Sequence, residues 1–139
     1  MRQIPEGYRA TLDVLVAYDM TVDFGTLGPV HPVYATYWMT RHMEEASRTM
    51  LLPFLEDGED AVGRAVQVSH IAPALPGTRL TVTATYENTD QRRVIARCTV
   101  RSAAGNLIGT GETVQVVVGQ RWFQERLALL RAEMPDASR

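Results

Sequence analysis

A histidine lies inside an apolar, strand-like segment of the sequence, VQVSHIAPALPG at residues 66–77. Val66, Val68 and His70 are two residues apart along the chain, so they share one face of the expected strand. A lone histidine in a strand is most often structural, with a ring nitrogen bonded to the backbone. A buried imidazole nevertheless needs partners for both nitrogens, and a pKa of about 6.5 suits general base catalysis. His70 is therefore the first candidate catalytic residue.

A second candidate lies in the segment YATYWMTRHMEEASRTMLL, residues 34–52. Thr36, Thr40, Glu44 and Arg48 recur every fourth residue, which predicts a polar stripe on a helix. Glu44 could activate a water molecule or attack a carbonyl carbon directly. The ordinary alternative is a solvated stripe in which Glu44 pairs with Arg48.

Thr36, at the start of this expected helix, is the third candidate. Its hydroxyl is typical of an N-cap, which accepts a backbone N–H bond. Alternatively, the hydroxyl lies beside free N–H groups, where the oxyanion of an acyl transfer would be stabilised. Eight helical residues separate Thr36 from Glu44 by about 12 Å. We therefore expect Glu44 and His70 to form the closer pair.

The periodicity of the chain predicts the elements that must position these residues. Residues 12–18 alternate as a strand, residues 23–33 carry Gly and Pro as in a loop, and residues 34–52 have helical spacing. Four further strands follow, joined by short turns that favour antiparallel pairing. The fold class is thus α+β, a curved antiparallel sheet of about five strands wrapped around one long helix, plus an amphipathic C-terminal helix. The residues that mark that last helix are Phe123, Leu127, Leu130 and Met134.

The composition and length limit the classes of partner and compartment. The 139 residues suit one domain, residues 1–139, and the net charge of −2 offers no basic field for nucleic acid. Arg93, Arg97 and Arg101 share one strand face and could meet phosphates, but a solvated face is the commoner meaning. One cysteine and three scattered histidines form no zinc pattern and no intrachain disulfide. No cofactor or metal is expected.

The same sequence contains no apolar run as long as a signal peptide core or a membrane span. Its single cysteine, Cys98, favours a reducing compartment. The chain is therefore predicted to be cytoplasmic, without a membrane partner.

The order of the expected elements resembles the hot-dog fold. Within it, PVYATYWMTRHMEEA followed by GRAVQVSHIAPALPGTRLTVTA resembles the fluoroacetyl-CoA thioesterase family, over roughly residues 32–118. Two motifs carry this resemblance: A-T…M-E-x-A in the helix, and G-x6-H-x-A…P-G in the strand and turn. In this order and spacing the two motifs together are fairly specific.

The resemblance implies an acyl-CoA thioesterase that hydrolyses a small acyl-CoA at a Thr36, Glu44 and His70 site. It also implies substrate-binding roles for Gly63 and Val22, and a homodimer or higher oligomer with acyl-CoA near the dimer interface. The segment 23–33 is shorter than the family's lid and has one phenylalanine, and Thr113 stands where we expect a family arginine. Two alternatives remain open: a hot-dog enoyl-CoA hydratase or dehydratase, and a non-catalytic protein that binds acyl-CoA or another ligand.

Overall fold

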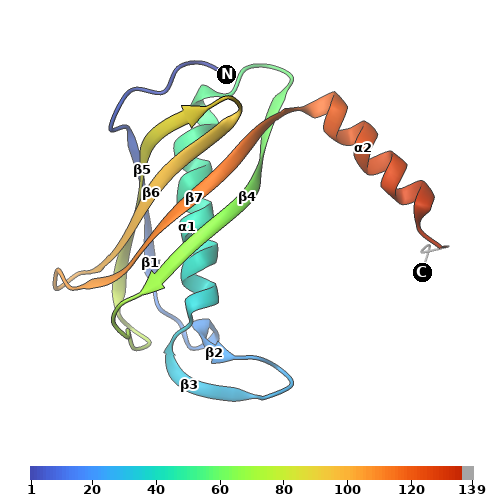
Figure 1. The fold of residues 1–139 in the computed structure, drawn as a ribbon. Helices are drawn as coiled ribbons and strands as arrows, with labels where there is room; N and C mark the ends of the chain where they lie inside the picture. Colours follow the sequence, from blue (N-terminus) through green and yellow to red (C-terminus); the bar gives the residue numbers. More distant parts are fainter. Residues whose placement is uncertain (136–139) are drawn as a thin grey trace.

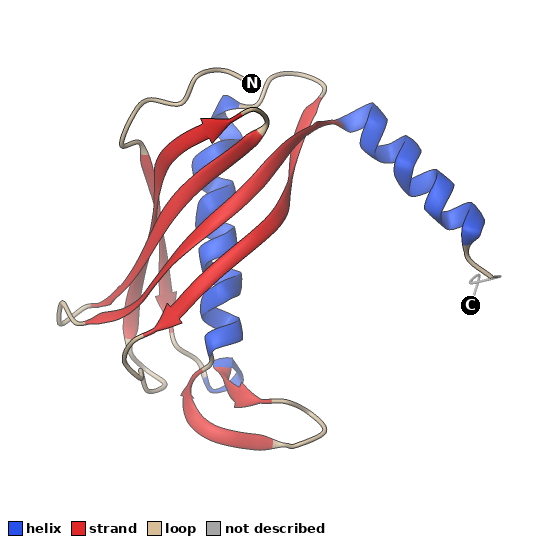
Figure 2. Cartoon of the chain, viewed as in Figure 1, coloured by secondary structure: helices blue, strands red, loops and turns tan. Residues whose placement is uncertain are grey.

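A curved antiparallel sheet wraps around one long helix in the computed structural model, which describes residues 1–135 (Figure 1, Figure 2). The α+β class and the five-stranded sheet predicted from the sequence are confirmed. In chain order, the elements are β1 Arg9–Leu15, η1 Tyr18–Met20, β2 Thr21–Asp23, β3 Pro29–Tyr34, α1 Thr36–Leu51, η2 Leu52–Phe54, β4 Glu59–His70, β5 Arg79–Asp90, β6 Arg93–Ser102, β7 Leu107–Gly119 and α2 Gln120–Glu133.

The sheet has the strand order β1-β5-β6-β7-β4, with every neighbouring pair antiparallel. Strand β4 is one edge and pairs only with β7 among the described strands. In that pairing Gly63 lies opposite Gln115 and His70 lies opposite Gly109, with a register shift between Gly63 and Ala65. The outer edge of β4 therefore keeps backbone groups that no described strand pairs.

Helix α1 lies against the concave side of the sheet (Figure 1). Met39, Met43, Ala46 and Met50 are fully buried there, as their helical spacing predicts. The helix ends where Pro53 enters the 3-10 turn η2, since the ring of proline disfavours helix at the preceding residue. The buried side of α1 thus fixes which helical positions face solvent.

Two segments near the N-terminus differ from the sequence prediction. Residues 23–33, expected to be a loop, instead supply most of a two-stranded ribbon, β2 and β3. Gly25 and Gly28 both have positive φ in the turn between these strands, which explains why the segment reads as a loop. The first strand begins and ends earlier than predicted, and Tyr18 lies outside it with 83% of its surface exposed.

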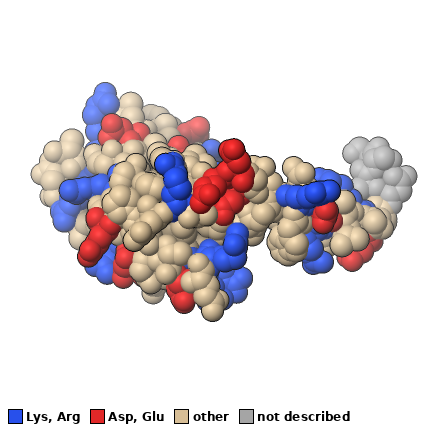
Figure 3. Space-filling model, turned by 90° about the horizontal axis from the view of Figure 1, so that it is seen from above, with Lys and Arg blue, Asp and Glu red and all other residues tan. Residues whose placement is uncertain are grey.

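Helix α2 projects away from the sheet beyond the end of β7 (Figure 1). Its amphipathic pattern is present, but Leu130 and Met134 are 46% and 57% exposed, so no described part of the chain covers this face. Acidic and basic side chains are interspersed over the body and over this projecting lobe (Figure 3). No helix within residues 1–135 is long and apolar enough to cross a membrane.

Candidate active site

Thr36 and His70 meet at the end of the molecule where α1 begins and β4 ends. The Oγ1 atom of Thr36 lies 2.8 Å from Nδ1 of His70, within hydrogen-bond distance. The contact forms because α1 and β4 run in opposite directions along the sheet (Figure 1). Of the two roles considered for Thr36, the N-cap is excluded, since Ala35 is the N-cap and the Thr36 hydroxyl faces the imidazole instead.

The second nitrogen of His70 has no hydrogen-bond partner among the described residues. Its Nε2 atom is buried, and the ring of Tyr34 stands edge-on to the imidazole at a centroid distance of 6.2 Å. When Nδ1 accepts a hydrogen bond from the Thr36 hydroxyl, the single N–H of the neutral ring is on Nε2. Nδ1 of His70 can then take the proton of the Thr36 hydroxyl, while Nε2–H remains a donor for a bound group.

Glu44 faces a different part of β4. A Cβ atom at Gly63 would lie 2.9 Å from Oε2 of Glu44, so the carboxylate rests directly over the bare glycine backbone. Both residues line a cavity of about 290 Å3 between α1, β4 and β7. A carboxylate above an open backbone and beside a cavity is suitably placed to orient a water molecule or a ligand.

Arg48 does not pair with Glu44, as the ordinary alternative for the polar stripe would require. The guanidinium of Arg48 donates to Oδ1 of Asp60 at 2.9 Å and to the carbonyl of Ala61 at 2.8 Å. The backbone N–H of Ala61 and then Arg48 lower the pKa of Asp60. Arg48 is thereby engaged with the start of β4, and the Glu44 carboxylate has no ion-pair partner among the described residues.

Glu44 and His70 do not form the close pair expected from the sequence. Glu44 lies over Gly63, and Gly63 and His70 are seven residues apart on β4, which is about 23 Å along the strand. Within one chain the structure therefore holds two pairs, Thr36 with His70 and Glu44 with Gly63. Val22 is half-buried in the β2–β3 ribbon opposite His31, and the preceding residue, Thr21, pairs with Tyr34 near the start of α1.

Gln115 is a cavity residue that the sequence analysis missed. It is only 6% exposed, it lines the cavity beneath Glu44, and its Nε2 atom has no hydrogen-bond partner among the described residues. The neighbouring Thr113 is satisfied, because its hydroxyl donates to Ser47 Oγ at 2.7 Å. The signal was present in the sequence, since residues 113, 115 and 117 share one alternating face and only 117 is apolar.

A buried tyrosine–histidine pair is the second feature that the sequence analysis missed. The hydroxyl of Tyr34 lies 2.5 Å from Nδ1 of His42, and their rings stack at an interplanar angle of 11°. Burial raises the pKa of Tyr34 and lowers that of His42, so both side chains are held neutral. The helical pattern predicts His42 on the inner face of α1, but not its partner.

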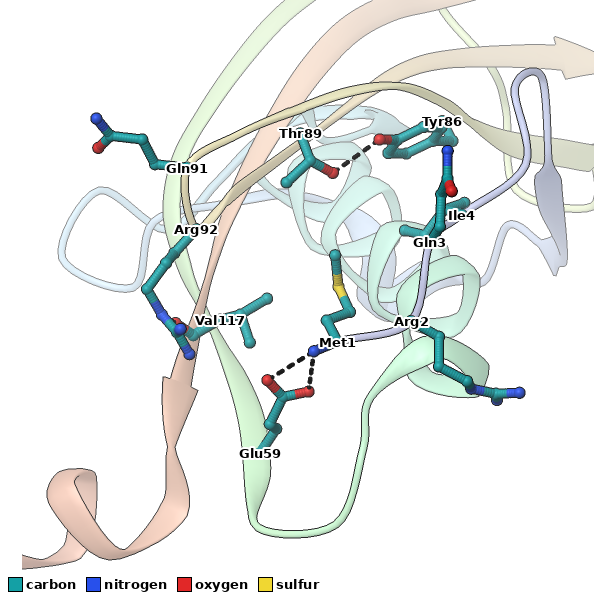
Figure 4. Close-up of a pocket in the computed structure, with 10 residues that line it drawn as sticks. All are labelled: Met1, Arg2, Gln3, Ile4, Glu59, Tyr86, Thr89, Gln91, Arg92 and Val117. Carbon is teal, nitrogen blue, oxygen red and sulfur yellow. Dashed lines mark hydrogen bonds and ion pairs between the residues drawn. The ribbon is translucent and has the colours of Figure 1, made fainter.

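A larger hollow, of about 440 Å3, lies at the N-terminus and contains none of the candidate residues (Figure 4). The amine of Met1 donates to Glu59 at 2.8 Å there, which raises the pKa of the amine and lowers that of the Glu59 carboxyl. The hydroxyl of Tyr86 is likewise paired with Thr89. These charged and phenolic groups are already partnered, so the hollow offers no reactive set comparable to Thr36 and His70.

The chain is similar to known proteins in both sequence and fold. The family described as fluoroacetyl-CoA-specific thioesterase matches residues 16–121. The fluoroacetyl-CoA thioesterase of Streptantibioticus cattleyicolor is 33% identical over 128 residues, covering 87% of this chain and 90% of that protein. A thioesterase superfamily member from Thermus thermophilus is 48% identical and has a TM-score of 0.93, with 95% of this chain and 96% of that chain covered.

The fold is also shared with a more distant protein. A hot-dog-like protein from Thermanaerovibrio acidaminovorans has a TM-score of 0.81 at 23% identity, covering 89% of this chain and 90% of that chain. The sequence match over most of the chain and this shared architecture lead to one conclusion. The protein has the hot-dog fold and belongs to the fluoroacetyl-CoA-specific thioesterase family.

Proposed function

We propose that this protein is an acyl-CoA thioesterase that hydrolyses a small acyl-CoA to the free acid and CoA. The observation that carries the proposal is the Thr36–His70 contact of 2.8 Å at the start of α1, in a member of this family. Solved variants of the fluoroacetyl-CoA thioesterase hold acetyl-CoA in one case and fluoroacetate with CoA in another. Those ligands support acyl-CoA as the substrate class here.

The chemistry assigns a task to each of the three polar residues. His70 accepts a proton from Thr36 or from water, and the attacking oxygen adds to the thioester carbonyl. The C–S bond then breaks and CoA leaves as the thiol with the proton that His70 holds; an acyl group on Thr36 is released by water in the same way. The first turn of α1 stabilises the oxyanion, because its backbone N–H groups lack helical partners. Glu44 either orients the hydrolytic water or attacks the carbonyl to form an anhydride, and Gln115 lies in the same cavity to contact the acyl group.

A homodimer would reconcile this chemistry with the separation of the two pairs. We propose that the unpaired edge of β4 pairs antiparallel with β4 of a second copy. If the two-fold axis passes through residue 67, the extra residue of the register shift after Gly63 places Gly63 of one chain opposite His70 of the other. Glu44 of one subunit would then act in the same site as the Thr36–His70 pair of the partner subunit. Val22 would be a further contact to the substrate.

The activity is tested by thiol release from a panel of short, branched and aromatic acyl-CoAs. We expect turnover by the wild type and a loss of about 100-fold or more in kcat for His70→Ala and Glu44→Gln, as for residues acting in proton transfer. His31→Ala and Glu6→Gln are matched controls, because each changes an exposed side chain of the same type outside the cavity that Glu44 lines. Both controls should retain wild-type rates.

Two other outcomes would overturn the proposal. Loss of enoyl absorbance without thiol release would make the protein a hydratase or dehydratase. Saturable binding of acyl-CoA with no turnover of any kind would make it a binding protein, with Glu44 and His70 structural. A cytoplasmic location stays a prediction, which fractionation of the producing cells would check.

A further inference from the structure

The structure contains a buried polar pair that the proposed hydrolysis does not use, Tyr34 with His42. Tyr34 is fully buried and His42 is 6% exposed. Burial keeps the phenol protonated and the imidazole neutral, so one of these two groups donates to the other across the 2.5 Å contact between the Tyr34 hydroxyl and Nδ1 of His42. An apolar pair would fill this space without placing two polar groups in the core.

Tyr34 also packs against His70 and is anchored to the turn that follows β4. Its ring edge faces the ring of His70 at 6.2 Å and an interplanar angle of 74°. Its backbone N–H donates to the carbonyl of Ala74 at 2.8 Å, in the turn that follows β4. Along the chain it precedes the Thr36 hydroxyl by two residues, so one side chain lies between the start of α1 and the end of β4.

His70 needs a restraint beyond its contact with Thr36. The χ2 torsion of histidine is broad, so a single hydrogen bond leaves the plane of the ring weakly defined. Nε2 adds no restraint from the described residues, because it has no hydrogen-bond partner among them. The edge of Tyr34 is the aromatic surface packed against His70, and the hydrogen bond to His42 fixes the Tyr34 ring in turn.

We propose that Tyr34 is a positioning residue for His70 and that His42, through its hydrogen bond to the phenol, holds Tyr34 in place. The pair orients the imidazole so that Nδ1 faces the Thr36 hydroxyl. The catalytic consequence rests on the proposed thioesterase activity, whereas the orientation of the ring does not. Misplacing a proton acceptor by a fraction of an ångström lowers the rate of the chemical step more than it weakens substrate binding.

The test compares Tyr34→Phe, His42→Leu and the double variant with the wild type. We expect kcat to fall by about tenfold in each single variant, with KM within about twofold, and the double variant to be no slower than the worse single variant. Tyr86→Phe is the matched control, because it also removes a phenol that is hydrogen-bonded, at 2.7 Å to Thr89, in the N-terminal hollow. That control should leave kcat unchanged.

The second measurement reads the ring itself, through the imidazole 15N chemical shifts of histidine-labelled protein, assigned with His70→Ala. The His70 shifts should move in Tyr34→Phe and His42→Leu and stay constant in Tyr86→Phe. If a single variant fails to fold, the double variant leaves no buried polar atom of the pair unpartnered and supplies the same comparison.

The two proposals fail in different ways. Absence of thiol release by the wild type overturns the thioesterase, while the 15N shifts still decide whether the pair positions His70. A folded Tyr34→Phe or double variant with wild-type kcat and unchanged His70 shifts overturns the positioning role.

Discussion

Gly63 shows how one missing side chain makes room for a functional group. The Glu44 carboxylate lies so close to its backbone that a Cβ atom at residue 63 would approach Oε2 to 2.9 Å. Such a distance is too short for carbon against oxygen, so one of the two atoms must move. The carboxylate is the end of a flexible side chain, which makes it the atom that moves.

A Gly63→Ala substitution should therefore impair catalysis more than stability. We expect the free energy of unfolding to change by less than about 1 kcal/mol, because the clash is relieved by a rotamer change of Glu44. We expect kcat for acyl-CoA hydrolysis to fall by about tenfold or more as the carboxylate leaves its place. Gly119→Ala is the control, since its nearest neighbour would be at an ordinary 3.9 Å. Wild-type kcat in a folded Gly63→Ala protein would contradict this role of Glu44.

Strand β7 is the element that sets how closely α1 approaches the sheet. Its inward row carries two glycines and two polar residues, Gly109, Gly111, Thr113 and Gln115. A Cβ atom at Gly111 would lie 2.5 Å from the carbonyl oxygen of Gln67 and 2.7 Å from Sδ of Met43. The methionines of α1 therefore fill space that larger residues on β7 would deny them.

Gly111→Ala should consequently destabilise the fold. One of its contacts is backbone, which cannot rotate away, so overpacking should cost about 1–3 kcal/mol. Urea unfolding at equilibrium measures the change, with Gly119→Ala as the substitution that adds the same atom at an ordinary contact distance. Equal midpoints for the two variants would show that α1 shifts freely on the sheet.

The whole molecule presents two features that one chain does not complete. The edge of β4 is unpaired, and exposed apolar residues of α2, Trp122, Leu129 and Leu130, are covered by no described residue. Both lie on the same side of the sheet, since α2 projects past the β4 edge (Figure 1). A second copy of the chain would bury these surfaces in one association.

The composite site predicts complementation between two inactive variants. Glu44→Gln and His70→Ala proteins, unfolded together and refolded at equal amounts, should regain about a quarter of wild-type activity. Half of the dimers would be mixed, and each mixed dimer would have one intact site of its two. Analytical ultracentrifugation of the wild type should show the dimer. No recovery from mixed dimers would show either that Glu44 and His70 do not act in one site or that each site takes both residues from the same subunit.

The local pattern of the sequence determined the α+β class, the buried Ala/Met face of α1 and the candidate polar residues. Period-two and helical spacing depend only on which residues are apolar, so they survive without tertiary information. The β2–β3 ribbon was not predicted, because its segment is rich in Gly and Pro and its pairing depends on the turn conformation of Gly25 and Gly28.

Only the tertiary structure decided which of the polar residues meet. Sequence spacing favoured Glu44 with His70, whereas the antiparallel course of α1 and β4 joined His70 to Thr36 and Glu44 to Gly63. The contacts of Tyr34 with His70 and Ala74 were equally hidden, because those residues are distant along the chain. Periodicity reports which face a residue occupies, but its neighbours on that face are fixed by strand register and by the position of the helix on the sheet.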